Sequence, residues 1–287
     1  MPVTQILGKG QPARLNVLVV AEGFRLQEIG RFKARCGSVV AAIKAAPWYQ
    51  RAPYLALWRA DTEVQGNEPA LGWPIPPCSP TAPPLPPVRF GASYGKDGVD
   101  RCLGGKDGDV LRLKLQLQSE LRQSTPTFPG FDRVLVLVNS LIYGGSGLGT
   151  VAWSSITPGL YIPMALHELG HTFGLKDEYE LECKVPRTAS NSLKDFNISS
   201  DPVRPPWAKW IPPSAPKVTK GGRCETCDVP SPYPAAVVGA FEGAYYEHCG
   251  YFRPSHRCRM RDLKDPFCVI CDMIIANVLD PKLPDAI

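Results

Sequence analysis

Two histidines four positions apart restrict the fold of this chain more than any other feature of its sequence. Residues 167–179 read HELGHTFGLKDEY, in which His167 and His171 begin and end an H-E-x-x-H segment. On an α-helix, four positions correspond to about 400° of rotation and about 6 Å of rise. Both imidazoles then leave one face of the helix, one turn apart, where each can bind the same Zn²⁺. We therefore expect a helix over about 163–173 that carries one zinc ion.

The acidic residues beside the histidines predict the rest of a hydrolytic site. Glu168 is too close in sequence to share the ligand plane, so its carboxylate is expected to act as general base toward a water on the metal. A third ligand must follow the helix, and Gly174 allows the chain to turn back after it. Asp177 stands ten positions after His167, where the metzincin pattern H-E-x-x-H-x-x-G-x-x-H has its last histidine. We prefer Asp177 as the third ligand, with Glu178 as its competitor.

The zinc helix and several other stretches resemble the immunoglobulin-A-peptidase family of zinc metalloendopeptidases. The signature of that family is an H-E-x-G-H or H-E-x-x-H helix followed by Gly and then D-E-Y, which is similar to residues 167–179. The resemblance implies a metalloendopeptidase with one catalytic Zn²⁺ and a polypeptide substrate. It implies ligand roles for His167, His171 and Asp177 and the base role for Glu168. Further similarity lies in LNVLVVAEGF, LVNSLIYGGSG, VVGAFEGAYYEHCGYFRP, CRM (258–260) and FCVIC (267–271).

The whole chain, residues 1–287, is expected to form a single catalytic domain with an α/β (α+β) fold of the metzincin or zincin-like type. An upper subdomain, to about residue 174, is expected to hold a mixed sheet and the active-site helix. A lower subdomain, about 175–287, is expected to be loop-rich and cysteine-rich, because seven of the ten cysteines lie within 183–271. Apolar periodicity predicts strands at 14–20, 54–64 and, in a central position, 131–139, and helices at 26–46, 109–123 and 267–279, with Pro47 ending the first.

A proline-rich segment interrupts the first half of the chain. Residues 73–88 contain eight prolines, which leave too few amide donors for a sheet or a helix. We expect an extended surface loop, because the strands on either side read as parts of one sheet. A linker between two domains is the alternative interpretation.

Several residues outside the zinc helix are candidates for supporting roles, with ordinary packing as the alternative. Met260 is the candidate for a Met-turn, which in metzincins forms an apolar floor beneath the metal. One of three tyrosines is a candidate hydrogen-bond donor to the developing oxyanion: Tyr245, Tyr246 or Tyr251. Three glycines are candidates for an edge strand to which a peptide substrate adds, with a tight turn as the alternative: Gly144, Gly145 and Gly147.

The cysteines allow more than one arrangement. CETC (224–227) and CVIC (268–271) together suit a structural Cys₄ zinc site, although the gap of 40 residues between them exceeds the usual spacing. Disulfides are the preferred alternative, because this half of the chain is poor in regular structure and cross-links would stabilise it. A redox pair is the weakest interpretation, since no thioredoxin-like βαβ pattern surrounds either motif.

Composition excludes some classes of function and leaves others open. A net charge of +5 without a basic stripe argues against nucleic-acid binding, and no apolar run approaches the roughly 18 residues of a transmembrane helix. The first residues lack the apolar core of a signal peptide, which favours the cytoplasm, whereas the family resemblance and the cysteine content favour export. The alternatives to a peptidase are a catalytically inactive zincin-like binding protein and a zinc amidase acting on a non-protein amide.

Overall fold

The computed structural model of the protein describes residues 3–10, 12–62, 89–96, 99, 101–180, 192–215, 217–218 and 237–284. The chain forms two compact units, Met1–Thr172 and Phe173–Ile287. The proline-rich segment 73–88 and the CETC motif at 224–227 lie outside the described residues. The interpretations of those two segments therefore stay predictions, as does the division of one catalytic domain near residue 174.

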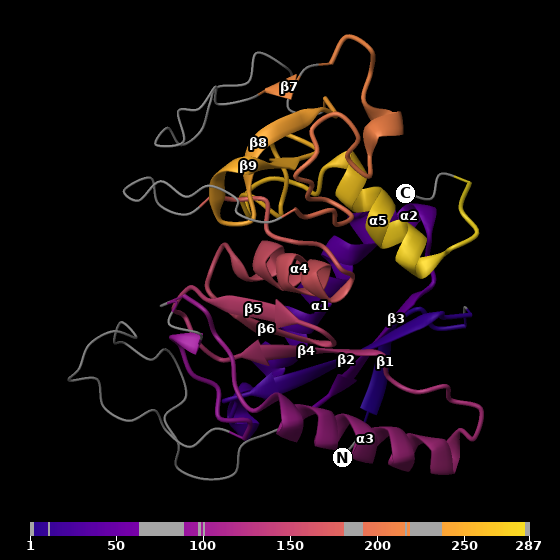
Figure 1. Cartoon of the computed structure of the whole chain (residues 1–287). Helices are drawn as coiled ribbons and strands as arrows, with labels where there is room; N and C mark the ends of the chain where they lie inside the picture. The colour runs from indigo at the N-terminus through magenta and orange to yellow at the C-terminus, as the bar shows by residue number, and fades with distance from the viewer. Residues whose placement is uncertain are drawn as a thin grey trace, which may run out of the picture. The chain divides into compact units, whose positions relative to one another are not determined.

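A mixed sheet of six strands forms the centre of the first unit. Its strands are β1 (Val3–Leu7), β2 (Leu15–Glu22), β3 (Leu55–Ala60), β4 (Arg133–Val138), β5 (Gly145–Leu148) and β6 (Val151–Ser155). They are ordered β1-β3-β2-β4-β6-β5 (Figure 1). Neighbours among β3, β2, β4 and β6 pair in parallel, whereas β1 and β5 are antiparallel edge strands. The apolar run 131–139 thus becomes the interior strand β4, as its composition predicts.

Four α-helices accompany this sheet in the described part of the first unit: α1 (Ile29–Ala45), α2 (Pro47–Arg51), α3 (Asp107–Ser124) and α4 (Tyr161–Thr172). A 3₁₀ turn, η1 (Leu26–Glu28), precedes α1, so the predicted helix 26–46 is present but begins more tightly wound. Pro47 follows the end of α1, and it also opens α2. A proline is tolerated there because the amide of the first helical residue has no partner within the helix.

Alternate side chains of the strands fill the two faces of the sheet. On one face, the buried core joins β2, β4 and β6 to α3, with Leu18, Val136 and Trp153 packed near Leu117. Trp153 also donates a hydrogen bond from Nε1 to Asp107 Oδ1 at 2.8 Å, which ties the start of α3 to the sheet. The helices α1 and α4 lie on the opposite face (Figure 1), where α4 contacts β5 and β6. The sheet therefore provides a rigid base for α4.

In its described residues, the second unit contains a small sheet and the α-helix α5 (Val269–Leu279). The strands β7 (Lys217–Val218), β8 (Ala240–Ala244) and β9 (Glu247–Arg253) are ordered β7-β8-β9, with β8 and β9 antiparallel. The helix agrees with the expectation for 267–279, but the sheet was not predicted, because its strands are short and lack regular alternation. Trp207, buried beside the 3₁₀ turn η3 (Ala208–Trp210), donates from Nε1 to the carbonyl of Gly239 at 2.7 Å.

The described cysteines of the second unit agree with the preferred expectation of disulfides only in part. Cys249 is disulfide-bonded, whereas Cys258, Cys268 and Cys271 are buried free thiols. Disulfides therefore do not account for the CVIC pair. Among the described residues of both units, no helix has the length and apolar character needed to span a bilayer.

Candidate active site

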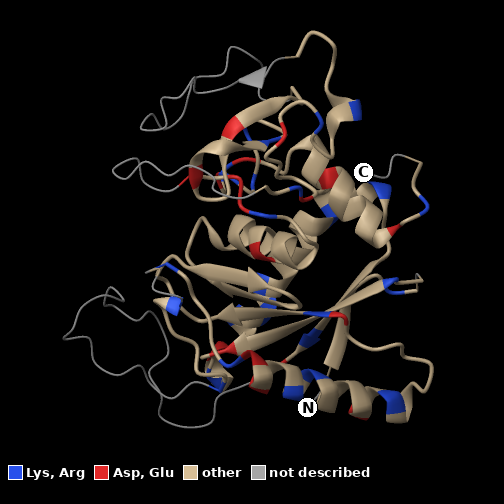
Figure 2. Cartoon of the chain, in the orientation of Figure 1, with Lys and Arg blue, Asp and Glu red and all other residues tan. Residues whose placement is uncertain are grey.

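Helix α4 holds the H-E-x-x-H residues on a rigid support in the first unit. The helix is largely buried through apolar side chains such as Met164, Leu166 and Leu169. Glu168 is its only Asp, Glu, Lys or Arg residue, and Figure 2 shows the remainder of α4 in tan. Pro163 lies in the first turn, where its missing amide donor breaks no helical hydrogen bond. A buried carboxylate on so apolar a helix indicates a functional role, because Glu side chains are seldom this deeply buried in proteins.

The structure brings His167, Glu168 and His171 together. Their ligand atoms lie within 4.8 Å of one another, and the two imidazole rings are 4.8 Å apart at an interplanar angle of 89°. Nε2 of His171 is 3.9 Å from Oε2 of Glu168. His167 and Glu168 are 8% and 6% exposed, so water reaches them only from a limited direction. Two imidazole nitrogens beside a carboxylate form a donor set that suits a divalent cation such as Zn²⁺.

The edge strand β5 crosses close to this group because it lacks side chains at two positions. A Cβ atom on Gly145 would overlap the carboxylate of Glu168. A Cβ atom on Gly147 would lie 2.5 Å from the carbonyl oxygen of Glu168 and 2.8 Å from Cβ of His171. Any other residue at Gly147 would push the strand away from the helix, and any other residue at Gly145 would displace the Glu168 carboxylate. The glycines therefore set the distance between the sheet edge and the candidate metal ligands.

Within the described residues, some main-chain groups of β5 form hydrogen bonds with neighbouring segments, and others do not. Gly144, a predicted strand glycine that lies just before β5, accepts a hydrogen bond from the amide of Ser155, on the β6 side. Gly145 pairs on the outer side, donating to the Arg101 carbonyl at 3.2 Å and accepting from the Leu103 amide at 3.3 Å. Because main-chain groups alternate in direction along a strand, Gly147 also faces the outer side. In the described part of the chain, we find no hydrogen-bond partner for those groups of Gly147.

In the second unit, Asp177 is held by Tyr246. The phenol of Tyr246 donates a short hydrogen bond to Oδ2 of Asp177, and the Tyr245 amide donates to the Asp177 carbonyl at 3.1 Å. Burial, followed by the negative charge of Asp177, raises the pKa of Tyr246 above its usual value. The φ angles of Tyr245 and Tyr246 are +50° and +69°, values that non-glycine residues seldom adopt. Such strain is concentrated at functional sites, because the surrounding structure must hold it in place.

The other tyrosine candidate lies elsewhere in the same unit. Tyr251 belongs to β9, and its ring packs at 6.1 Å from the ring of Tyr245. Tyr246 is thus the tyrosine whose phenol contacts a predicted ligand, whereas Tyr245 contributes a main-chain amide. Met260 is fully buried, and its carbonyl accepts a hydrogen bond from the Glu178 amide at 2.7 Å. The structure therefore brings the predicted Met-turn residue next to the Asp177 segment.

Glu178 lies in a different environment from Asp177. Its Oε1 accepts hydrogen bonds from Nδ2 of Asn197 at 2.9 Å and from Sγ of Cys271 at 3.1 Å. Burial, followed by the charge of Cys258, raises the pKa of Glu178 well above its usual value. Sequence reasoning missed this grouping of a carboxylate with cysteines, although the CRM and CVIC motifs contained the signal for it.

The sequence of the chain matches a known protein family. Residues 103–226 and 222–279 match the family model described as IgA Peptidase M64. The chain belongs to this IgA peptidase family. The matched residues include α4, Asp177, Met260 and α5, so the resemblance noted in the sequence is confirmed where its motifs are densest. No curated protein matches the chain.

Membership of the IgA peptidase family defines the activity at a coarse level. The protein is a peptidase, and therefore a hydrolase that acts on a polypeptide. Peptidases of this family are metallopeptidases, which agrees with the donor set on α4. Family membership says nothing about which bond is cleaved, because specificity depends on the residues that line the substrate site.

Proposed function

We propose that this IgA peptidase family member is a zinc-dependent metalloendopeptidase that hydrolyses internal peptide bonds. The observation that carries the proposal is the grouping of His167, Glu168 and His171, whose ligand atoms lie within 4.8 Å of one another on a buried, apolar helix. Imidazoles at positions i and i+4 are zinc ligands in this kind of motif, and the carboxylate between them is the base.

The proposed ligand set is His167, His171 and Asp177. The sequence offset of Asp177 supports its inclusion, and so does its hydrogen bond from Tyr246, since carboxylate ligands are commonly oriented by such outer partners. Glu178 is disfavoured as the third ligand because its carboxylate groups with three cysteines of the second unit instead. In this proposal Met260 supplies the apolar floor of a Met-turn, consistent with its complete burial.

The chemistry divides between the ion and the protein. When bound, Zn²⁺ would act as a Lewis acid. It would polarise the scissile carbonyl and lower the pKa of water, so that a strong nucleophile is available near neutral pH. Glu168 accepts the proton of the attacking water and passes it to the leaving amine. Its low exposure keeps bulk water away, which strengthens its interactions with the reacting groups. Tyr246 orients Asp177 through its hydroxyl group.

Substrate binding is proposed at the outer edge of β5. An extended peptide that adds to a sheet edge forms main-chain hydrogen bonds there, and it presents its carbonyls at regular intervals. Gly145 already uses its outward groups with Arg101 and Leu103, so Gly147 is the residue proposed to pair with substrate. Its closeness to His171 and Glu168 supports this assignment.

Removal of zinc tests the proposed function directly. The full chain is expected to release new amino termini from a casein-type substrate, to lose this activity in 1,10-phenanthroline, and to regain it when Zn²⁺ is restored. Mass spectrometry of the products distinguishes internal cleavage from trimming at the ends. Metal binding without new amino termini on any protein would favour the inactive binding protein, and activity confined to a non-protein amide would favour the amidase.

The replacement Gly147→Ala tests the role of β5. The added methyl group would meet a backbone oxygen at 2.5 Å, so we expect about 1–3 kcal/mol of destabilisation and at least a tenfold lower kcat/KM as strand and helix separate. Urea unfolding and peptide-cleavage kinetics measure the two effects. Gly108→Ala on α3 is the matched control, because a Cβ atom there meets nothing within 4 Å. Wild-type values for both quantities in Gly147→Ala would contradict the proposed contact.

A further inference from the structure

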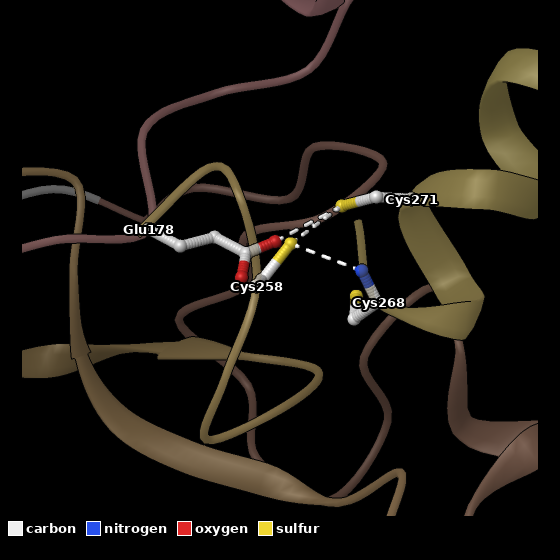
Figure 3. Close-up of side chains that lie close together, drawn as sticks. All are labelled: Glu178, Cys258, Cys268 and Cys271. Atoms are coloured by element: carbon white, nitrogen blue, oxygen red, sulfur yellow. Dashed lines mark hydrogen bonds between the residues drawn. The ribbon is translucent and has the colours of Figure 1, made fainter. Parts of the chain in front are cut away.

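A second group of metal-ligating side chains lies within the second unit. Glu178, Cys258, Cys268 and Cys271 bring one carboxylate and three thiols together (Figure 3). Cys268 is the N-cap residue of α5, and Cys271 lies in the first turn of that helix. Cys258 follows β9 in sequence. Three separate segments of the chain therefore converge on one point.

The distances within this group match a metal–thiolate site. All four ligand atoms lie within 4.8 Å of one another. The Sγ atoms of Cys258 and Cys271 are 3.7 Å apart, and Sγ of Cys271 is 3.1 Å from Oε1 of Glu178. With Zn–S bonds of about 2.3 Å in a tetrahedral site, two sulfur ligands are separated by about 3.8 Å. Bonded cysteine sulfurs are only about 2.05 Å apart, so this pair is not a disulfide.

The burial of these four side chains favours a role in binding a metal ion. Glu178, Cys258 and Cys271 are 0% exposed, and Cys268 is 8% exposed. A carboxylate in such surroundings is unfavourable unless it is paired or binds a metal. Oε1 of Glu178 has Asn197 and Cys271 as partners, but Oε2 has no hydrogen-bond partner among the residues that the structure describes. This oxygen therefore retains a lone pair for coordination.

The surroundings favour a thiolate at Cys268, whereas burial raises the pKa of the Cys258 and Cys271 thiols, so a bound cation would have to displace their protons. Cys268 lies at the N-terminus of α5, where the helix dipole stabilises negative charge. The Cys268 amide donates to Sγ of Cys258 at 3.3 Å, an interaction of the kind that supports metal-bound sulfur. The guanidinium groups of Arg253 and Arg259 are near enough to Cys258 to interact with its charge. These cations partly balance the negative charge of a site with four anionic ligands.

We propose that Glu178, Cys258, Cys268 and Cys271 bind a second, structural Zn²⁺. Four protein ligands leave no position for water, which is the arrangement of structural rather than catalytic zinc. The site fastens α5 and the Cys258 segment to the residue that directly follows Asp177. Because Met260 also accepts a hydrogen bond from Glu178, the ion fixes the segment of the proposed third ligand. This inference does not depend on peptide hydrolysis by the H-E-x-x-H group.

Metal analysis of full-length variants tests the proposal. Wild type is expected to contain about two zinc ions per chain, and both His171→Ala and the double variant Cys258→Ser/Cys271→Ser about one. Cys36→Ser is the matched control, because Cys36 is also a buried free thiol, and it should retain the wild-type content. A wild-type content of one ion, with none left in His171→Ala, would overturn the second site.

Cobalt substitution identifies the ligands by a readout other than activity. His171→Ala loaded with Co²⁺ is expected to show the strong near-ultraviolet absorption of sulfur-to-metal charge transfer, since its cysteines are intact. Cys224→Ser/Cys227→Ser should keep that absorption, whereas Cys258→Ser/Cys271→Ser should lose it. The reverse pattern would assign the thiolates to the CETC motif and overturn the proposal. A spectrum of His171→Ala without thiolate absorption would do the same.

A measurement on the unaltered chain covers the case in which the cysteine variants fail to fold. Alkylation mapped by mass spectrometry should label Cys258, Cys268 and Cys271 only after zinc is removed by a chelator, because metal-bound thiolates are protected. Equal labelling with and without the chelator contradicts the site. Resistance to alkylation in denaturant until a reductant is added would show disulfides instead, which also contradicts it.

Discussion

Glu168→Gln is expected to lower kcat for peptide-bond cleavage by about 10²–10⁴-fold while the protein keeps its full zinc content. The amide has nearly the shape of the carboxylate but cannot accept the proton of the attacking water. Its packing on α4, where Glu168 is only 6% exposed, should be preserved. Steady-state kinetics on a casein-type substrate and metal analysis of the same preparation measure the two quantities.

The control for this variant is Glu120→Gln on α3, which removes a carboxylate from the same unit without touching α4. It should retain wild-type kcat and wild-type zinc content. Full activity in Glu168→Gln would remove Glu168 from the mechanism. Loss of zinc together with activity would instead assign its carboxylate to the ligand set.

His171→Ala should abolish hydrolysis and release one zinc ion per chain. The imidazole ring of His171 is 4.8 Å from that of His167, so its removal takes away one of only two nitrogen ligands proposed for the ion. Loss of an outer partner of a ligand already weakens metal binding by about 10–100-fold, and loss of a ligand itself should exceed this. Metal analysis and the casein assay again provide the measurements.

His256→Ala is the matched control for this second variant. His256 lies in the second unit, contacts the ring of Phe241 at 6.0 Å between centroids, and is not among the proposed ligands. It should keep both zinc ions and activity. If His171→Ala retained its activity and both zinc ions, the catalytic metal site would have to lie outside α4. Asp177→Ala extends the series, since loss of the same ion there would identify the third ligand.

Much of the fold followed from local patterns that the sequence displays directly. The helical spacing of apolar residues predicted α1, α3 and α5, and the apolar run that became β4 was correctly expected in the interior of the sheet. Strands β1 and β6 and the small sheet of β7, β8 and β9 were missed. Their residues lack a clear period of two, and they become strands through pairing with partners that local sequence does not reveal.

The candidate site was likewise only partly predictable from the sequence. Spacing alone predicted that His167 and His171 would share one face of a helix, because the geometry of a helix is fixed by its own hydrogen bonds. Which of Tyr245, Tyr246 and Tyr251 donates to the developing oxyanion stays a prediction. The hydrogen bond from Tyr246 to Asp177 is a different contact, and the sequence did not predict it, because it joins residues 69 positions apart in the chain.

The sequence by itself determined the H-E-x-x-H helix, the α/β character of the first unit and the membership of the IgA peptidase family. Only the tertiary structure decided that the glycines of β5 lie against Glu168 and His171, and that Glu178 joins three cysteines. The physical reason is that the geometry of a helix depends on hydrogen bonds between residues four positions apart, so its pattern is visible in a short stretch of sequence. A site assembled from distant segments depends on packing and chain reversals, whose outcome is settled only when the whole chain has folded.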